Sequence, residues 1–341
     1  MRFLLWAVML AAISSCGKNP EPAVPETEIG ISVLSGPLTR GATIFDGDET
    51  LIETAKGGGN MTISAYLTGT NTPYISNERV FYFVDDLTNP WRFRKDEGLT
   101  YTFVKHVWPP EGAGLDFFAY MPYSAEVPSY ISNIDYDKDT GPTFSCDLPV
   151  TKATQDPLKE FIYAYKAGVD KNTASGWAEL NFEHPFALIY LRLAQGHRDM
   201  TINSITFENI YKAGSFAYSD TPQWTPSGDP DNNLEIPVDK IIPGDLNFGS
   251  DIDGPFFVLP QTFAGNTVTI SMDTDWEGHV TGEHPGTNMI YTVDVPMPSG
   301  WEPGKAYVYT LDMGDIKEEI MFKVIVEAWD IQGYHIPVDV E

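Results

Sequence analysis

The chain has 341 residues, of which 42% are hydrophobic and 13% aromatic, and it carries a formal net charge of −27 from 48 acidic and 21 basic residues. This excess of negative charge argues against binding to a nucleic-acid backbone, or to an anionic bilayer surface through charge. The length favours two domains, and the 29 glycines, 26 prolines and abundant Tyr and Phe favour β structure with many turns over long helices.

The first residues have the pattern of an export signal. Arg2 precedes an apolar run over residues 3–13, which is too short to span a membrane, and two serines and Cys16 follow. The end of this stretch, Ile-Ser-Ser-Cys, resembles a bacterial lipobox, with Ile where Leu is usual. The pattern predicts a lipoprotein signal peptide over residues 1–15 and acylation of Cys16. An ordinary secretory signal that is cut nearby is the alternative.

Lipid on Cys16 would leave Cys146, the other of the two cysteines, without a disulfide partner. Several acyl chains together anchor a protein firmly to a bilayer, so we expect Cys16 to hold the chain at a membrane. Residues 16–27 are rich in Pro and Glu, and this composition predicts an extended, solvated tether.

A first β-strand is predicted over residues 28–34. Its apolar residues Ile29, Ile31 and Val33 alternate with Glu, Gly and Ser, which is the period of two that is typical of a half-buried strand. Ser, Gly and Pro at residues 35–37 end the strand because they are turn residues.

Arg40 and Gly41 follow on what we expect to be an exposed connection. Loop tips are preferred sites of proteolysis, so a trypsin-like protease could cut after Arg40. The alternative is that residues 28–34 form a permanent edge strand and that Arg40 is an ordinary solvated residue.

Short alternating or apolar runs fill the rest of the chain, with no convincing amphipathic helix among them. Turn residues separate the runs, and this spacing predicts an all-β sandwich or barrel. A polar stretch with Gly and Ser over residues 167–176 suggests a boundary, so the predicted domains are residues 28–172 and 173–341. The runs are 61–67, 79–84, 91–94, 101–104, 115–122, 157–165, 177–184, 187–193, 201–210, 256–261, 267–272, 301–311 and 320–329.

The last strand, predicted over residues 334–341, repeats the pattern of the first. Ile336, Val338 and Val340 alternate with Pro, Asp and Glu, so three aliphatic side chains share one face. We hypothesise that the first strand is a removable plug, and that the last strand of another copy can replace it as a donor strand.

Several short blocks, in their order along the chain, resemble those of the fimbrillin family, the type V pilins that oral and gut Gram-negative anaerobes carry on their outer surface. The ordered set spans most of the chain and, together with the lipobox, carries the resemblance. Pro185 directly after His184 departs from the family pattern and affects one strand end. The blocks are Trp108-Pro109, residues 115–122, 180–184 and 259–261, and Trp301 with residues 304–309.

This resemblance implies two tandem, transthyretin-like β-sandwich domains of the Greek-key type, and export as a lipoprotein to the outer membrane and cell surface. It also implies that an Arg-specific, trypsin-like protease removes the first strand, and Arg40 is the matching position. Family members then polymerise with like or different fimbrial subunits by donor-strand exchange and support adhesion. The family also includes tip, anchor and non-polymerising surface lipoproteins.

One acidic pattern has part of the spacing of a calcium-binding loop. Asp135, Asp137 and Asp139 occupy positions 1, 3 and 5 of that spacing, but Gly141 falls one place late and position 12 is Cys146 rather than Glu. We therefore interpret residues 135–141 as an acidic turn, with a cation site as the alternative.

A second acidic pattern lies over residues 273–279. Asp273, Asp275, Glu277 and His279 alternate there and would share one face of a strand. A hard cation or zinc could bind such a face, although an exposed acidic strand is the ordinary interpretation.

No catalytic motif stands out, and we expect no enzymatic activity, no metal and no cofactor. Cys146 lacks a recognisable His/Asn signature of a nucleophile, and His184, at an apolar strand start, is interpreted as a hydrogen-bonded core residue. An enzyme such as a glycoside hydrolase would need an acidic pair at a defined separation. Four tryptophans are candidates for stacking on sugar rings, with core packing favoured for Trp108: Trp91, Trp108, Trp224 and Trp276.

The leading interpretation is a lipid-anchored precursor of a fimbrial subunit, matured at Arg40 and assembled through its C-terminal strand. The alternative is a surface lipoprotein that binds a glycan or host ligand as a monomer and never polymerises. Neither interpretation involves nucleic acid.

Overall fold

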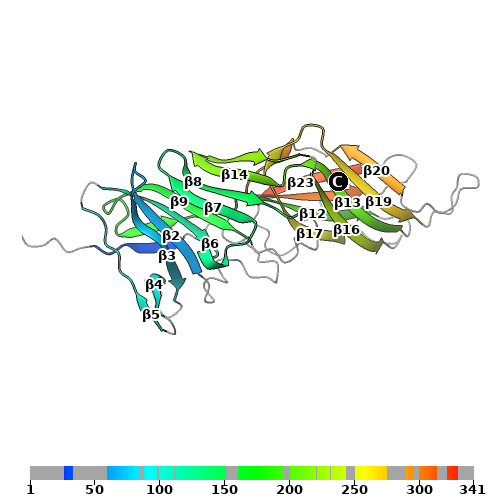
Figure 1. Ribbon diagram of the computed structural model, residues 1–341. Helices are drawn as coiled ribbons and strands as arrows, with labels where there is room; N and C mark the ends of the chain where they lie inside the picture. Colours follow the sequence, from blue (N-terminus) through cyan, green and yellow to red (C-terminus); the bar gives the residue numbers. More distant parts are fainter. Residues whose placement is uncertain are drawn as a thin grey trace, which may run out of the picture.

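The chain folds as an all-β protein, as its composition and strand spacing predicted. The computed structural model describes residues 27–33, 60–83, 88, 90–97, 100–110, 113–150, 160–195, 200–219, 221–230, 232–242, 250–274, 289–294, 299–312 and 321–328. The strands pair into several sheets, and these sheets follow one another along the long axis of the molecule (Figure 1). Within the described residues the helical structure is one short 3-10 turn, η2 (Ser124–Glu126), and no helix there is long and apolar enough to cross a membrane.

The N-terminal part of the chain forms a nine-stranded sheet. Its strands are β1 (Gly30–Val33), β2 (Asn60–Leu67), β3 (Pro73–Tyr82), β4 (Trp91–Glu97), β5 (Thr100–Phe103), β6 (Leu115–Met121), β9 (Ile162–Val169), β10 (Trp177–Leu180) and β11 (Phe182–Glu183). The order is β10-β1-β4-β3-β2-β6-β9-β11, with β5 attached to β4. Only Asn181 separates the two strands at the ends of this order, so the sheet curls round until one chain segment joins both ends.

Two four-stranded sheets form the C-terminal sandwich. One has the order β17-β12-β22-β23, and the other β16-β13-β19-β20. Buried side chains from both sheets meet in a single core between them. A small pair of strands, β18 (Gln261–Thr262) and β21 (Gly300–Trp301), lies beside the sandwich. The eight strands are β12 (Ala187–Gln195), β13 (Met200–Ile210), β16 (Asn232–Ile242), β17 (Ser250–Val258), β19 (Thr267–Thr274), β20 (Met289–Asp294), β22 (Lys305–Asp312) and β23 (Met321–Ala328).

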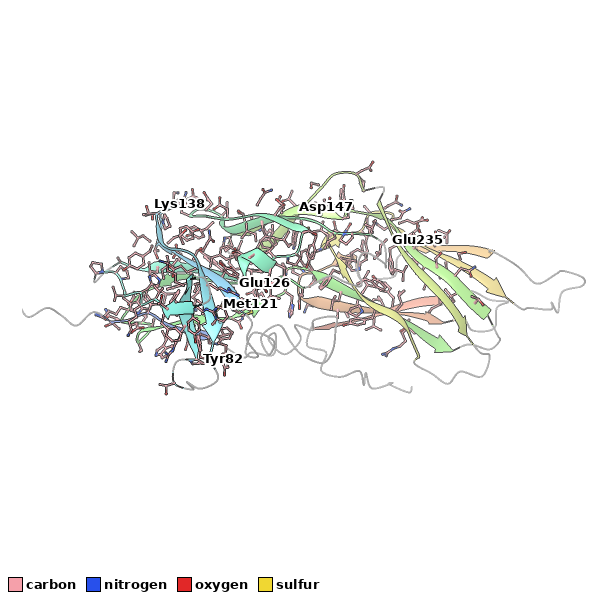
Figure 2. The ribbon with its side chains drawn as sticks, turned by 60° about the horizontal axis from the view of Figure 1, so that its bottom comes forward. Tyr82, Met121, Glu126, Lys138, Asp147 and Glu235 are labelled. Atoms are coloured by element: carbon pink, nitrogen blue, oxygen red, sulfur yellow. The ribbon has the colours of Figure 1, made fainter. Side chains whose placement is uncertain are left out.

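A further four-stranded sheet covers the junction between these parts. It has the order β15-β14-β8-β7 and contains β7 (Ile131–Asp137), β8 (Gly141–Asp147), β14 (Ala213–Ser219) and β15 (Thr221–Ser227). β8 comes from the first half of the chain and β14 from the second, and they pair antiparallel. Figure 2 shows Asp147, at the end of β8, between Lys138 towards one end of the molecule and Glu235 towards the other.

Strands in the middle of the molecule are apolar on both faces because each face meets a different core. All seven residues of β6 are buried. The odd-numbered residues from Leu115 to Met121 point into the curled sheet, whereas Phe118 and Tyr120 face the core beneath the junction sheet. β22 is shared in the same way, with Tyr307 in the sandwich core and Val308 in the junction core.

The predicted domain boundary falls in the connection between β9 and β10. Both of these strands belong to the curled sheet, and the β8–β14 pairing joins strands from the two sides of that boundary. The polar residues that suggested the boundary form a turn, in which Asp170 accepts hydrogen bonds from the backbone N–H groups of Asn172 and Thr173. The division into residues 28–172 and 173–341 stays a prediction.

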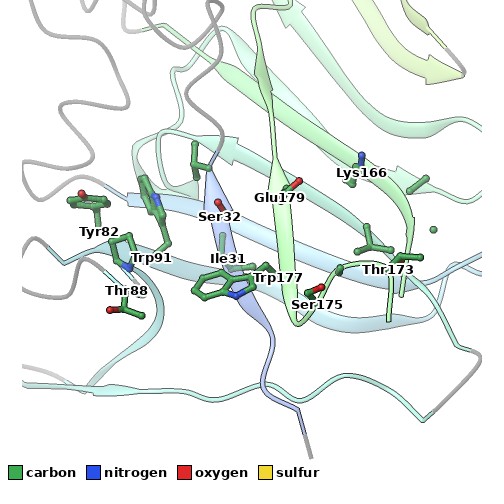
Figure 3. A pocket seen from close by; sticks show the side chains of 16 residues that line it. Ile31, Ser32, Tyr82, Thr88, Trp91, Lys166, Thr173, Ser175, Trp177 and Glu179 are labelled. Atoms are coloured by element: carbon green, nitrogen blue, oxygen red, sulfur yellow. The ribbon is translucent and has the colours of Figure 1, made fainter. Parts of the chain in front are cut away.

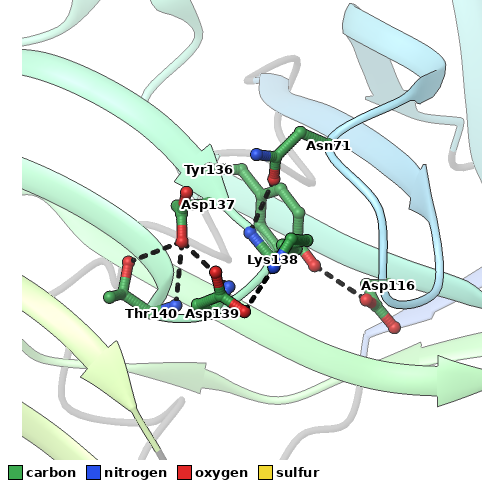
Figure 4. Close-up of polar contacts among 7 residues, drawn as sticks. All are labelled: Asn71, Asp116, Tyr136, Asp137, Lys138, Asp139 and Thr140. Carbon is green, nitrogen blue, oxygen red and sulfur yellow. Dashed lines mark hydrogen bonds and ion pairs between the residues drawn. The ribbon is translucent and has the colours of Figure 1, made fainter.

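A buried carboxylate connects the curled sheet to the junction sheet. Asp116 of β6 is 4% exposed and accepts hydrogen bonds from the Tyr136 hydroxyl at 2.7 Å, the Thr68 hydroxyl at 2.8 Å and the Gly168 backbone N–H at 2.7 Å. Figure 4 shows the contact with Tyr136. Burial and this hydrogen bond raise the pKa of Tyr136, so the phenol remains a donor across the physiological range.

We expect Tyr136→Phe to lower the free energy of unfolding by about 1.5–3 kcal/mol, because it removes a donor from a buried charge. Tyr74→Phe is the matched control. Tyr74 is 36% exposed and donates to the Val107 carbonyl, so its loss should cost about 0.5 kcal/mol or less. Urea unfolding of both variants measures the difference, and equal losses would contradict the bridging role of Asp116.

Candidate functional site

Strand β1 lies between two neighbouring strands, β10 and β4, and we call the groove that it fills the slot. It pairs parallel with β10 over four positions, beginning with Gly30 opposite Trp177. On its other side it pairs antiparallel with β4 at one position, Ile31 opposite Trp91. The predicted first strand is therefore present as a strand within the curled sheet, with a hydrogen-bonding partner along each edge.

The residues just before β1 are also held by backbone hydrogen bonds. The N–H of Ile29 donates to the carbonyl of His106 at 2.7 Å, and the N–H of Trp108 donates to the carbonyl of Thr27 at 2.9 Å. Removing this whole segment would leave unpaired polar groups on both walls of the slot.

The predicted alternation of the first strand matches its burial. Ile29 is 3% exposed, Ile31 is 1% exposed, and both belong to the core of the curled sheet, against which the partly buried Val33 also packs. Each fully buried aliphatic side chain contributes about 1.5–3 kcal/mol. Ordering the backbone of a strand costs about 1–2 kcal/mol per residue. The net gain from such a short strand is small, and its displacement from the slot stays a prediction.

The position of the Trp177 side chain explains why residue 30 is a glycine. A Cβ atom at this position would lie 2.6 Å from Cε3 of the Trp177 ring, well inside van der Waals contact. The Gly30 N–H also donates to the carbonyl of Gly176 at 2.8 Å. The indole of Trp177 therefore occupies the space where any other residue would put its side chain (Figure 3).

A cavity of about 790 Å³ adjoins this contact (Figure 3). Its lining comes from β1, β9, β10 and the turn between the last two, and from the end of β3, the start of β4 and the connection between them. Trp177 and Val33, both partly buried, contribute apolar surface, while the polar side chains of Lys166, Thr173 and Glu179 are exposed. The slot thus has free volume next to the indole that covers Gly30.

The other residues predicted for processing and assembly lie outside the described residues. These are the lipidation site Cys16, the cleavage site Arg40 with Gly41, and the donor-strand residues Ile336, Val338 and Val340. Their roles stay predictions.

In the acidic turn over residues 135–141, carboxylates contact backbone and side-chain groups of the same turn. Asp137 accepts hydrogen bonds from the backbone N–H groups of Asp139 at 2.8 Å and Thr140 at 3.2 Å, and these bonds lower the pKa of Asp137. Lys138 pairs with Asp139 (Figure 4). In the described part of the chain no group of three or more His, Cys, Asp or Glu side chains could hold a metal ion, and residues 275–279 fall outside that part.

His184 is a buried, hydrogen-bonded core residue, as predicted. Its ring Nδ1 contacts the carboxylate of Glu160, and both side chains are 1% exposed. Burial raises the pKa of Glu160 above its usual value. Cys146 is also buried, and burial raises the pKa of its thiol to about 12, so the thiol stays protonated near neutral pH.

Three of the four candidate tryptophans pack inside the protein rather than on an open face. Trp91 and Trp108 are buried. Trp224 is partly buried, donates its indole N–H to the Pro185 carbonyl at 2.6 Å and packs on Phe216. Trp276 lies outside the described residues.

Sequence reasoning missed an exposed group of rings beside β5, which we call the β5 aromatic surface: Phe83, Tyr101 and Phe103 with Arg92 and Arg94. Tyr101 is 46% exposed and Phe103 is 44% exposed. The guanidinium carbon of Arg94 lies 4.3 Å from the ring centroid of Tyr101, and that of Arg92 lies 5.0 Å from the centroid of Phe103. The alternation of aromatic and basic residues over 91–94 was the available signal.

The chain matches a family model described as fimbrillin-like over residues 47–329. No curated protein sequence matches it. A solved fimbrial protein from Bacteroides vulgatus ATCC 8482 is similar, with 16% identity, a TM-score of 0.53, and coverage of 89% of this chain and 99% of that chain. A candidate cell adhesion protein from Bacteroides ovatus ATCC 8483 has 15% identity, a TM-score of 0.51, and coverage of 92% and 100%. At these identities the likeness is one of fold.

We expect Gly30→Val to lower the unfolding free energy of the full chain by about 1–3 kcal/mol, because the new side chain collides with the indole of Trp177. Combining it with Trp177→Ala should recover most of the loss, which makes the two substitutions non-additive. Urea unfolding of the single and double variants measures this coupling. Ser32→Val, at the next position on the same face, is the control, and an equal cost there would contradict a specific contact.

Proposed function

The chain belongs to the fimbrillin-like family, and we propose that it is a subunit of a surface fimbria, as a structural, tip or anchor component that supports adhesion. In this proposal it is exported as a lipoprotein and held at the outer membrane through Cys16. A trypsin-like, Arg-specific protease cuts after Arg40, and the last strand of another subunit, residues 334–341, then replaces β1. The role is structural, without catalysis or a cofactor.

The position of β1 is the observation that supports this function best. Its slot has backbone hydrogen-bonding groups on both walls and an apolar floor that Ile29 and Ile31 now cover. A sheet that has lost such a strand presents unpaired N–H and C=O groups, which an extended segment of another chain can satisfy. The sequence of residues 334–341, where a last strand is predicted, has the alternation that such a slot requires.

Covalent attachment decides which strand occupies the slot. While β1 belongs to the same chain, its effective concentration is on the order of millimolar, so it excludes a competing strand from another subunit. Cleavage after Arg40 removes that advantage, because β1 is then a separate peptide with little net binding energy. A head-to-tail contact of this kind does not close on itself and therefore builds a filament.

We expect limited trypsin treatment of the secreted full chain to give one early cut after Arg40, followed by ladders that resist SDS. Arg40→Gln should prevent both, and deletion of residues 334–341 should prevent the ladders while the precursor keeps its melting temperature. Gel electrophoresis and a thermal melt measure these outcomes. A cut protein that remains monomeric would contradict assembly, and loss of folding in the deletion would place that strand within its own subunit.

Carbohydrate binding by a monomer is a second candidate function, and the β5 aromatic surface favours it. Exposed Tyr and Phe rings stack on the C–H faces of sugars, and neighbouring guanidinium groups bind carboxylates. Arg92 and Arg94 place positive charge beside these rings in a chain of net charge −27. The chemistry fits an oligosaccharide that contains uronic acid units.

We expect the double substitution Tyr101→Ala and Phe103→Ala to weaken binding of hyaluronan fragments at least about fivefold, because two stacked rings contribute about 1–3 kcal/mol together. Calorimetric titration with these fragments, and with neutral maltohexaose for comparison, measures the effect. Tyr74→Ala is the matched control, since Tyr74 is another exposed tyrosine. Binding that is unchanged in the double variant, or absent in the wild type, would contradict this second function.

A further inference from the structure

The contact between Trp177 and Gly30 restricts which strand can fill the slot. The indole lies where a Cβ atom would extend from Gly30, at 2.6 Å for the closest ring atom. Any strand that runs in the direction of β1 and pairs with β10 must pass this point. A residue with a side chain fits there only if the indole moves away, whereas glycine fits with the indole in place.

The C-terminal segment contains one glycine, Gly333, between residues 329 and 341. Its position relative to the apolar residues that follow matches that of Gly30, because Tyr334 and Ile336 come one and three residues later, as Ile31 and Val33 do, whereas Gln332 stands where β1 has Ile29. In β1 the glycine faces away from the core, while Ile31 and Val33 point towards it. Counting onward from Gly333, the same alternation points Tyr334 and Ile336 towards the core, because strand residues alternate between faces.

We propose that Trp177 sets the register of the incoming strand by admitting Gly333 of the neighbouring subunit at the position of Gly30. Tyr334 then takes the place of Ile31, and Ile336 takes the place of Val33. This inference rests on the proposed strand exchange and adds to it the identity of the residue that is recognised. It extends the incoming strand towards its N-terminus, beyond residues 334–341.

Other registers that keep the same residues facing the core place a side chain against the indole of Trp177. If Ile336 took the place of Ile29, Pro337 would stand at the position of Gly30. Proline has no N–H to replace the one that donates to the Gly176 carbonyl at 2.8 Å, and its ring would overlap the indole. Shifts that bring His335 or Asp339 to this position also place a side chain against Trp177.

The cavity beside the slot accommodates the larger incoming residues. Ile31 and Val33 both line the cavity of about 790 Å³. Tyr334 and Ile336 are larger than the residues that they replace, and in the proposed register their additional atoms enter the adjoining volume. Val338 and Val340 then continue the apolar face beyond the end of β1. In this register Gln332 takes the place of Ile29, which is 3% exposed, so the added apolar contact within the slot comes from Tyr334 and Ile336.

The first experiment follows ladder formation by the full chain after trypsin treatment. Gly333→Val should slow the appearance of SDS-resistant ladders at least tenfold. Combining it with Trp177→Ala should restore the rate to within about threefold of the wild type, because the obstacle has been removed. Thr102→Val, on the exposed strand β5, is the control and should assemble at the wild-type rate.

Disulfide formation between cysteine variants tests the register of the incoming strand directly. Glu179 is the β10 partner of Ser32, and the proposed register puts His335 at the place of Ser32. A mixture of Glu179→Cys and His335→Cys chains should therefore form an intersubunit disulfide, since paired neighbours lie within bonding distance. A mixture of Glu179→Cys and Asp339→Cys chains should not. The native Cys146 is buried and does not compete.

These outcomes separate the inference from the proposed function. Normal ladders from Gly333→Val, failure of Trp177→Ala to rescue it, or a disulfide to Asp339→Cys in place of His335→Cys would overturn the register while strand exchange stands. If the wild-type chain forms no ladders after the cut, strand exchange itself fails and the register fails with it.

Discussion

The parallel pairing of β1 with β10 is the interaction on which the N-terminal part of the structure depends. Residues 177–183 pair with β1 through β10 and with β9 through β11, so this one segment joins the two ends of the curled sheet. β1 completes the closure, and Ile29 and Ile31 fill the core that the closed sheet surrounds. A strand with few residues and small net binding energy therefore completes the whole sheet, which makes it a suitable element to exchange.

The junction sheet connects the N-terminal part of the molecule to the C-terminal sandwich. β8 and β14 pair directly, and the core beneath them collects side chains from the outer faces of β6, β9, β12, β17 and β22. Side chains on the opposite faces of these strands belong to the cores of the curled sheet and of the C-terminal sandwich, so the junction core packs directly against both parts.

The sequence was informative where burial follows a period of two. The faces of β1 were predicted from the alternation of Ile29, Ile31 and Val33. A strand was also predicted over residues 115–122, but the structure alone shows that all seven residues of β6, Asp116 among them, are buried. Trp224 was harder to interpret because its neighbours along β15 are polar, yet alternate residues of that strand turn inward. The turn between β9 and β10 has the Gly, Ser and Asp content of a linker. Tight turns and linkers use the same residues, so composition alone does not tell whether a domain boundary lies there.

Sequence by itself determined that the chain is all-β, which residues of the first strand face a core, and that His184 is internal. The tertiary structure alone decided that β10 is the partner of β1, that Trp177 covers Gly30, and that Tyr101 and Phe103 remain exposed together. The physical reason is that alternation is a local property of a strand and fixes only the face of each side chain. The strand that lies alongside depends on how distant sheets pack and close, and no short stretch of residues contains that information.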